Sequence, residues 1–157
     1  DSSTRRRRPA FLRRRRVRVR KKTHSIGPID KMRWPAGSRL LGRGLISPED
    51  LHLFTITDRA EDAVNEIIAF YKNYHSSRYV RGRLVLRLNR PMPEQLLDAI
   101  NGEFADLLSQ GKIEHGAALP EERNDQDVLH LPRLMFWFNR KNSGRLRQLI
   151  DRINLGY

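Results

Sequence analysis

The chain of 157 residues contains no cysteine, which excludes disulfide bonds, thiolate catalysis and cysteine-based zinc sites. This absence fits a reducing compartment. No apolar run approaches the roughly 20 residues that a membrane-spanning helix needs. The arginine-rich start is not followed by an apolar core, so it is not a secretory signal. We therefore expect a cytoplasmic protein that does not associate with membranes.

The usual signatures of catalytic and nucleotide sites are also missing. The sequence has no GxGxxG, no GxxxxGK[ST] and no GxSxG. His52, His115 and His130 are scattered without the spacing of metal ligands. The sequence therefore predicts no metal, no cofactor and no catalytic residue in this chain.

Positive charge is concentrated at the start of the chain. Residues 1–48 hold 16 Lys+Arg and 2 Asp+Glu, a net charge of +14, whereas residues 49–157 hold 15 and 16, a net charge of −1. Like-charge repulsion and few apolar residues predict that residues 1–46 are disordered or poorly packed. The basic residues concerned are Arg5, Arg6, Arg7, Arg8, Arg13, Arg14, Arg15, Arg16, Arg18, Arg20, Lys21 and Lys22.

Three interpretations of this leader remain open. The first is a nucleic-acid-binding arm whose affinity comes from phosphate neutralisation. The second is a solvated tail with no specific partner. Alternatively, a GC-rich gene translated out of frame gives arginine runs of this kind without hydrophobic periodicity. The chain begins with Asp rather than Met, which favours a piece of a longer protein.

Regular patterning begins at Ser47, which precedes Pro48 and two acidic residues in the manner of a helix start. Asp58 with Glu61 resembles a capping box ahead of a helix over about 59–74. Apolar residues then recur at intervals of three and four, as on the core face of a helix: Ala60, Ala63, Val64, Ile67, Ile68, Tyr71 and Tyr74.

Residues 81–154 predict the order strand–helix–strand–strand–helix, packed as one α/β sandwich. Leu84, Leu86 and Leu88 alternate with Arg83 and Arg87, which indicates a strand with one solvated face. Gly111 is expected to end the first helix, and residues 112–115 to form a short strand. Residues 120–127 are acidic and predict a loop, whereas residues 134–138 form an apolar run typical of a strand covered on both faces.

The last helix is expected to begin at Asn142 or Ser143. Its predicted core face comprises Leu146, Leu149, Ile150 and Ile153. Its arginines, Arg145, Arg147 and Arg152, are interpreted as a solvated face.

The stretch 70–80, FYKNYHSSRYV, is a polar junction between the helix and the strand region. The candidate ligand-binding residues are Tyr74, His75, Ser76, Ser77, Arg78 and Tyr79. His75 is suited to proton transfer near neutral pH, Arg78 to clamping a phosphate or carboxylate, and the tyrosines to stacking on a base. The alternative is a polar helix end, in which Tyr71 and Tyr74 belong to the core and Ser76-Ser77 form the turn.

The run GLISPEDLHLF at 44–54, followed by Thr57-Asp58 and Glu61-Asp62-Ala63, resembles the end of the Rossmann domain in the LOG (Lonely-guy-type) family. The continuation NYHSSRYV and RLVLRL, with EFADLL, LPRL and GRLRQLIDRIN, resembles the C-terminal extension of a bacterial subgroup. The resemblance covers about 44–157.

The resemblance implies an α/β chain in three parts: a basic leader (1–46), the last Rossmann-like elements (47–75) and a small β-α-β-β-α extension (76–157). Members of the family hydrolyse the N-glycosidic bond of nucleoside 5′-monophosphates, using a PGGxGTxxE motif and an upstream arginine that this sequence lacks. The resemblance thus implies a fragment that is inactive alone, with a nucleotide bound by the parent and possible homo-oligomers. The alternative is a small α/β nucleic-acid-binding module with an arginine-rich arm.

Overall fold

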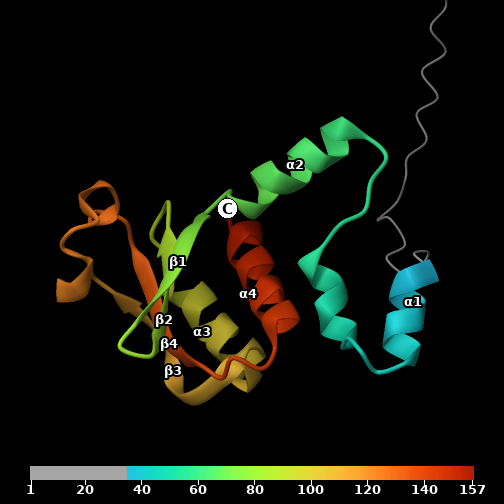
Figure 1. The fold of residues 1–157 in the computed structure, drawn as a ribbon. Coiled ribbons are helices and arrows are strands. Elements are labelled where there is room, and N and C mark those ends of the chain that lie inside the picture. Colours follow the sequence, from blue (N-terminus) through green and yellow to red (C-terminus); the bar gives the residue numbers. More distant parts are fainter. Residues whose placement is uncertain (1–34) are drawn as a thin grey trace, which may run out of the picture.

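A computed structural model describes residues 35–157, and the region is an α/β fold built on one four-stranded sheet (Figure 1). Residues 1–34, which hold most of the basic leader, lie outside the described part. The prediction of no regular structure up to residue 46 is wrong at its end, because Pro35–Gly42 forms helix α1. Pro35 occupies the first helical position, where its missing N–H costs nothing.

The sheet is antiparallel throughout and has the strand order β1-β2-β4-β3. The strands are β1 (Tyr74–Val80), β2 (Arg83–Leu88), β3 (Leu108–Gly116) and β4 (Arg133–Phe138). A tight turn joins β1 to β2 through Arg81 (φ 48°) and Gly82 (φ 84°). Positive φ at both central residues is the hairpin geometry that matches strand twist, and it explains the glycine.

Helices α3 (Glu94–Glu103) and α4 (Ser143–Leu155) cover one face of the sheet (Figure 1). Because β4 lies between β2 and β3, the unit β2-α3-β3 is a split β-α-β arrangement, and β1 extends its edge. The predicted order from residue 81 onward is confirmed, although α3 ends at Glu103, before the expected Gly111. Gly111 instead lies within β3, where its φ of 68° accompanies an irregular register.

The main core fills the space between these helices and the sheet. Leu84, Leu86 and Leu88 of β2 are buried there, which confirms their predicted alternation. The apolar run of β4 is buried on both faces except for the half-buried Trp137. The Asn142 side chain accepts a hydrogen bond from the Arg145 backbone N–H, which confirms the predicted start of α4. The predicted core face of α4 is also confirmed: Leu149, Ile150 and Ile153 are buried and Leu146 packs against them.

The opposite face of the sheet is covered by residues 117–131, which we call the acidic segment. It contains the short 3-10 turns η4 (Pro120–Glu122) and η5 (Gln126–Val128). Leu119 packs on a small second core of Val80, Val85 and Met135. The expectation that β2 has a solvated face is therefore wrong at Arg87, which is 7% exposed, because the acidic segment covers it.

Residues 47–71 form two helical pieces beside α4. The 3-10 helix η2 (Pro48–Leu53) has the predicted Ser47 cap, with reciprocal bonds between Ser47 and Asp50. It packs so closely on the start of α4 that a Cβ added to Gly144 would lie 2.0 Å from the Glu49 carbonyl oxygen. This contact requires glycine at position 144.

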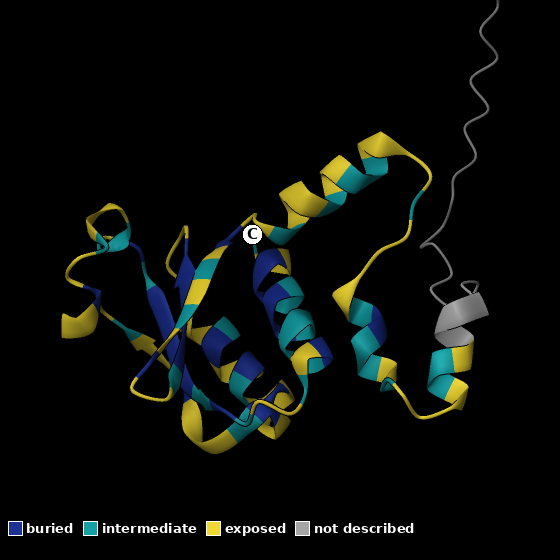
Figure 2. Ribbon diagram, viewed as in Figure 1, coloured by how far each residue is buried: buried dark blue, intermediate teal, exposed yellow. Residues whose placement is uncertain are grey.

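Helix α2 (Ala60–Phe70) projects away from the sheet and buries none of its residues (Figure 2). The predicted core face of this helix is therefore wrong at Val64, Ile67, Ile68 and Tyr71, which are exposed. It starts after Arg59 without a side-chain cap, so the predicted capping box at Asp58 is wrong. Thr57 instead accepts a hydrogen bond from the Arg59 backbone N–H. The helix ends at Phe70 and not near 74, because β1 already begins at Tyr74.

Candidate functional site

The predicted ligand-binding stretch lies along strand β1, at one edge of the sheet. Ser76 and Ser77 pair with Arg87 and Leu86 of β2, so they belong to the strand and not to a turn. The alternative interpretation as a polar helix end is therefore wrong. Tyr74 is buried as that interpretation expected, but Tyr71 is 53% exposed.

Because neighbouring residues of a strand point to opposite faces, β1 divides the candidate residues into two groups. On the helix side, the Tyr74 hydroxyl donates to Ser77 Oγ, and Tyr79 stacks under the Arg140 guanidinium at 4.3 Å. Ser76 and Arg78 share the other face with Arg87. His75 is exposed, with Nδ1 2.9 Å from Ser76 Oγ. The six residues therefore do not form a single site.

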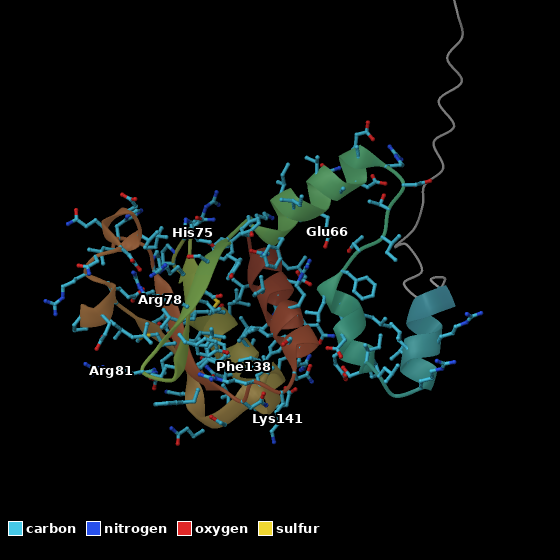
Figure 3. All side chains as sticks on the ribbon, in the orientation of Figure 1. Glu66, His75, Arg78, Arg81, Phe138 and Lys141 are labelled. Atoms are coloured by element: carbon cyan, nitrogen blue, oxygen red, sulfur yellow. The ribbon has the colours of Figure 1, made fainter. Side chains whose placement is uncertain are left out.

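Arg78 belongs to a larger group beneath the acidic segment, which we call the ion cluster: Arg78, Arg87, Arg133, Glu122 and Asp125 (Figure 3 labels Arg78). Three guanidinium groups face two carboxylates, so the cluster carries a formal charge of +1. Arg87 of β2 and Arg133 of β4 are paired directly, whereas Arg78 of β1 pairs with Val85, two residues from Arg87 on the same face. The two carboxylates come from the acidic segment.

Glu122 forms the buried centre of the ion cluster and is fully shielded from solvent. Its carboxylate accepts from Arg87 Nε (3.0 Å) and Nη2 (2.6 Å), and from Arg133 Nε (3.0 Å). Burial alone would raise the pKa of Glu122. The Leu119 backbone N–H, Arg87 and Arg133 all bond to the charged form and outweigh burial, so the pKa lies below its ordinary value.

Arg133 of β4 fixes the acidic segment to the sheet. Besides Glu122, its Nη1 and Nη2 donate to the carbonyls of Val128, Leu129 and Leu131. These bonds satisfy a guanidinium that is 1% exposed, as a buried cation requires. The inner half of the cluster is therefore a structural anchor.

The outer half of the ion cluster reaches solvent. Asp125 Oδ2 accepts from Arg78 Nη1 (2.5 Å) and from Arg87 Nη2 (2.8 Å). The Arg78 and Asp125 side chains are 35% and 38% exposed. Two guanidinium groups thus converge on one partly exposed oxygen, which is a favourable geometry for an oxyanion.

A second polar group fixes the corner between α2 and β1. Asn154 of α4 accepts from the backbone N–H groups of Asn73 (2.8 Å) and Tyr74 (2.9 Å) and donates to the Phe70 carbonyl. Asn73 and Asn154 are both buried. Asn154 therefore holds the start of β1 against the end of α2, and the Asn73 side chain accepts from the Arg90 backbone N–H.

The arginines of α4 are not the solvated face that we predicted. Arg147 bonds to Asp151 (2.8 Å) on its own helix and to Glu66 of α2 (2.7 Å), and it lies over the Phe70 ring (Figure 3 labels Glu66). Burial would lower the pKa of Arg147, but the two carboxylates more than compensate and raise it. Arg145 and Arg152 pair with Asp106 and Glu103.

The residues that complete the ion cluster were not predicted as site residues. Arg87 was assigned to a solvated strand face, Arg133 was not singled out, and residues 120–127 were predicted to form a loop. The available signal was charge complementarity between arginines on one strand face and an acidic stretch between two strands. Among residues 35–157, no group of three or more His, Asp or Glu is placed to hold a metal, and no helix is long and apolar enough to cross a membrane.

Comparisons with protein-family models, with curated protein sequences and with solved structures found no match for this chain. The resemblance to the LOG family therefore stays a prediction.

Proposed function

We propose that residues 47–157 are the C-terminal part of a LOG-like nucleotide-binding protein whose parent hydrolyses nucleoside 5′-monophosphates. In this proposal residues 47–75 are the last elements of the Rossmann-like domain and residues 76–157 are the extension. The chain alone is inactive, because the printed sequence contains no glycine-rich PGGxGTxxE motif.

The exposed apolar side of α2 is the observation that supports this proposal. Val64, Ile67, Ile68 and Tyr71, which we call the apolar stripe, are 53%, 59%, 63% and 53% exposed. A helix with one apolar face normally buries that face against a core. The stripe therefore has the chemistry of a helix whose packing partner is another part of a larger domain.

The contacts of α2 with α4 come from a different side of the helix. Glu66 and Phe70, which contact Arg147, lie roughly 160° and 120° around the helix from Val64 at 100° per residue, and Phe70 lies about 60° from Ile67. Phe70 packs on the core of the extension, whereas the apolar stripe is offset from it and stays exposed. This favours a second packing partner, as the proposed Rossmann-like domain would provide.

Translation of all reading frames of the source DNA upstream of Ser47 tests the proposal directly. We expect one frame to encode a strand rich in β-branched residues just before Ser47. The same frame should encode a GGxGT-type motif further upstream, within the length of one domain. A source sequence with no such motif in any frame contradicts the proposal. As a second measurement, the chain incubated with AMP should release no adenine, whereas release by the purified chain would show a site that the proposal does not contain.

The charge distribution favours a second candidate function, binding of nucleic acid by the arginine-rich arm. Within residues 35–157 the 17 Lys+Arg and 16 Asp+Glu give a net charge of only +1. Nine of these arginines form ion pairs: Arg59, Arg78, Arg81, Arg83, Arg87, Arg133, Arg145, Arg147 and Arg152. Affinity for RNA or DNA should therefore reside in residues 1–34.

Filter binding to a mixed-sequence RNA at several salt concentrations tests this second function. Binding by the arm should fall steeply with salt and disappear when residues 1–25 are deleted. Binding that is insensitive to salt, or that survives the deletion, contradicts it.

A further inference from the structure

The outer half of the ion cluster has the features of an occupied anion site. We propose that Arg78 and Arg87 form a binding site for a phosphate monoester dianion, and that Asp125 of the acidic segment occupies this site as an internal competitor. The proposal rests on the sheet face alone and is independent of the parent's activity.

The first argument is the coordination of Asp125. One carboxylate oxygen accepts from two guanidinium groups, at 2.5 Å from Arg78 and 2.8 Å from Arg87. Guanidinium groups that donate to a carboxylate oxygen suit a phosphate oxygen as well, because both are anionic acceptors. Asp125 Oδ2 is therefore a chemical substitute for one phosphate oxygen.

The second argument is charge. With Glu122 bonded to both Arg87 and Arg133, the ion cluster retains a formal excess of one positive charge. Exchange of the singly charged Asp125 for a dianion would neutralise that excess. Ser76, which pairs with Arg87 across the sheet, adds a hydroxyl group on the same face.

The third argument is that Asp125 is not needed to hold the acidic segment in place. The fully buried pair of Glu122 and Arg133 fixes the segment, Arg133 also bonds to the Val128 carbonyl, and Leu119 packs on the second core. The Asp125 backbone has its own bonds, from its N–H to the Glu122 carbonyl and from the Val128 N–H to its carbonyl. The side chain can therefore rotate into solvent while the backbone stays. The partly exposed pair with Arg78 resists displacement only weakly, and the buried Arg87 keeps its bonds to Glu122 when Asp125 leaves.

The site can be observed directly by NMR of the arginine Nε–Hε groups in the full chain. This signal separates Arg78 and Arg87 from the arginines of residues 1–34, which will also attract phosphate. Orthophosphate and AMP serve as probes, with sodium chloride titrated to the same ionic strength as a control. A preference for AMP would indicate a nucleotide ligand, and equal affinities would indicate recognition of the phosphate group alone.

The decisive variant is Asp125→Ala, with Asp125→Asn as a version of nearly the same shape. Both should bind orthophosphate up to roughly fivefold more tightly than the unmodified chain, because the competing carboxylate is gone. The matched control is Glu121→Ala, which removes an acid of the same segment that pairs with Arg81 and should leave the affinity at Arg78 and Arg87 unchanged. Adding Arg78→Ala to Asp125→Ala should abolish the gain.

Two results would overturn the proposal. One is that folded Asp125→Ala and Asp125→Asn show no phosphate-dependent shift at Arg78 or Arg87 beyond that caused by chloride. The other is that Glu121→Ala increases the affinity as much as Asp125→Ala, which would indicate a general effect of net charge.

Discussion

Replacement of Glu122 by glutamine tests the buried centre of the ion cluster. Glutamine keeps the size of the side chain but removes the charge and turns an amide donor toward two guanidinium groups. Neither Glu122 nor Arg133 exposes its side chain, so water cannot compensate for the loss. Removing one partner of a buried ion pair costs about 3–5 kcal/mol. That is a large part of the roughly 5–15 kcal/mol that stabilises a typical domain.

Urea denaturation at pH 7, followed by far-UV circular dichroism, measures this loss. With a slope of about 2 kcal/mol per molar urea, the midpoint should fall by roughly 1.5–2.5 M. Glu121→Gln is the matched control. Glu121 is the adjacent residue in the chain, and its carboxylate pairs with Arg81, whose side chain is 80% exposed. That substitution should cost less than about 1 kcal/mol. Equal losses for the two variants would refute the structural role assigned to Glu122.

The effect of Glu122→Gln should also depend on pH in a defined direction. The pKa of Glu122 is lowered in the folded chain, so its carboxylate stabilises the fold fully above the ordinary value of 4.5. As the pH falls below that value and through the folded pKa, the unfolded chain takes up the proton first and the stabilisation is lost. The difference between the unmodified chain and the variant should therefore shrink toward acid pH. A difference that grows on acidification would contradict this sign.

Three further predictions concern α2, η2 and the residues that contact them. Asn154→Ala should cost about 2–4 kcal/mol in thermal unfolding, because three hydrogen bonds are lost and backbone groups remain buried. A change under about 1 kcal/mol would contradict the role of Asn154. Gly144→Ala should displace η2 and speed proteolysis near residue 55, because the new Cβ would collide with the Glu49 carbonyl. A stabilisation of about 1 kcal/mol, which glycine to alanine gives at an uncrowded helix position, would contradict that collision. Ile68→Ser should change the free energy of unfolding by no more than about 0.5 kcal/mol while lowering binding of an apolar dye, because Ile68 is 63% exposed; a loss typical of a core isoleucine would show that α2 is packed in solution.

Several elements could be predicted because local chemistry alone specifies them. The alternating leucines of β2 and the continuous apolar run of β4 require strands with these faces, and Asn142 and Ser47 provide caps wherever they precede a helix. Gly82 could also have indicated the hairpin turn after β1, since it is flanked by residues that pair across the strands. An α/β sandwich with two helices on one face follows from these patterns.

The candidate site could not be predicted in the same way, because its residues are distant in the sequence. Residues 70–80 showed no clean alternation, since a register shift between Tyr74 and Ser76 places both tyrosines, Tyr74 and Tyr79, on the helix side. Whether Arg87 faces water or a carboxylate depends on where residues 117–131 cross the sheet, and that path is set by side-chain packing.

The sequence by itself thus determined the order of the elements from residue 81, the caps of η2 and α4, and the core face of α4. Only the tertiary structure decided that the polar junction is an edge strand, that Glu122 is buried between two arginines, and that the apolar stripe of α2 is exposed. The physical reason is that periodicity and capping act over a few residues. Ion pairing and burial depend on which distant segments come together, and a single sequence does not specify that locally.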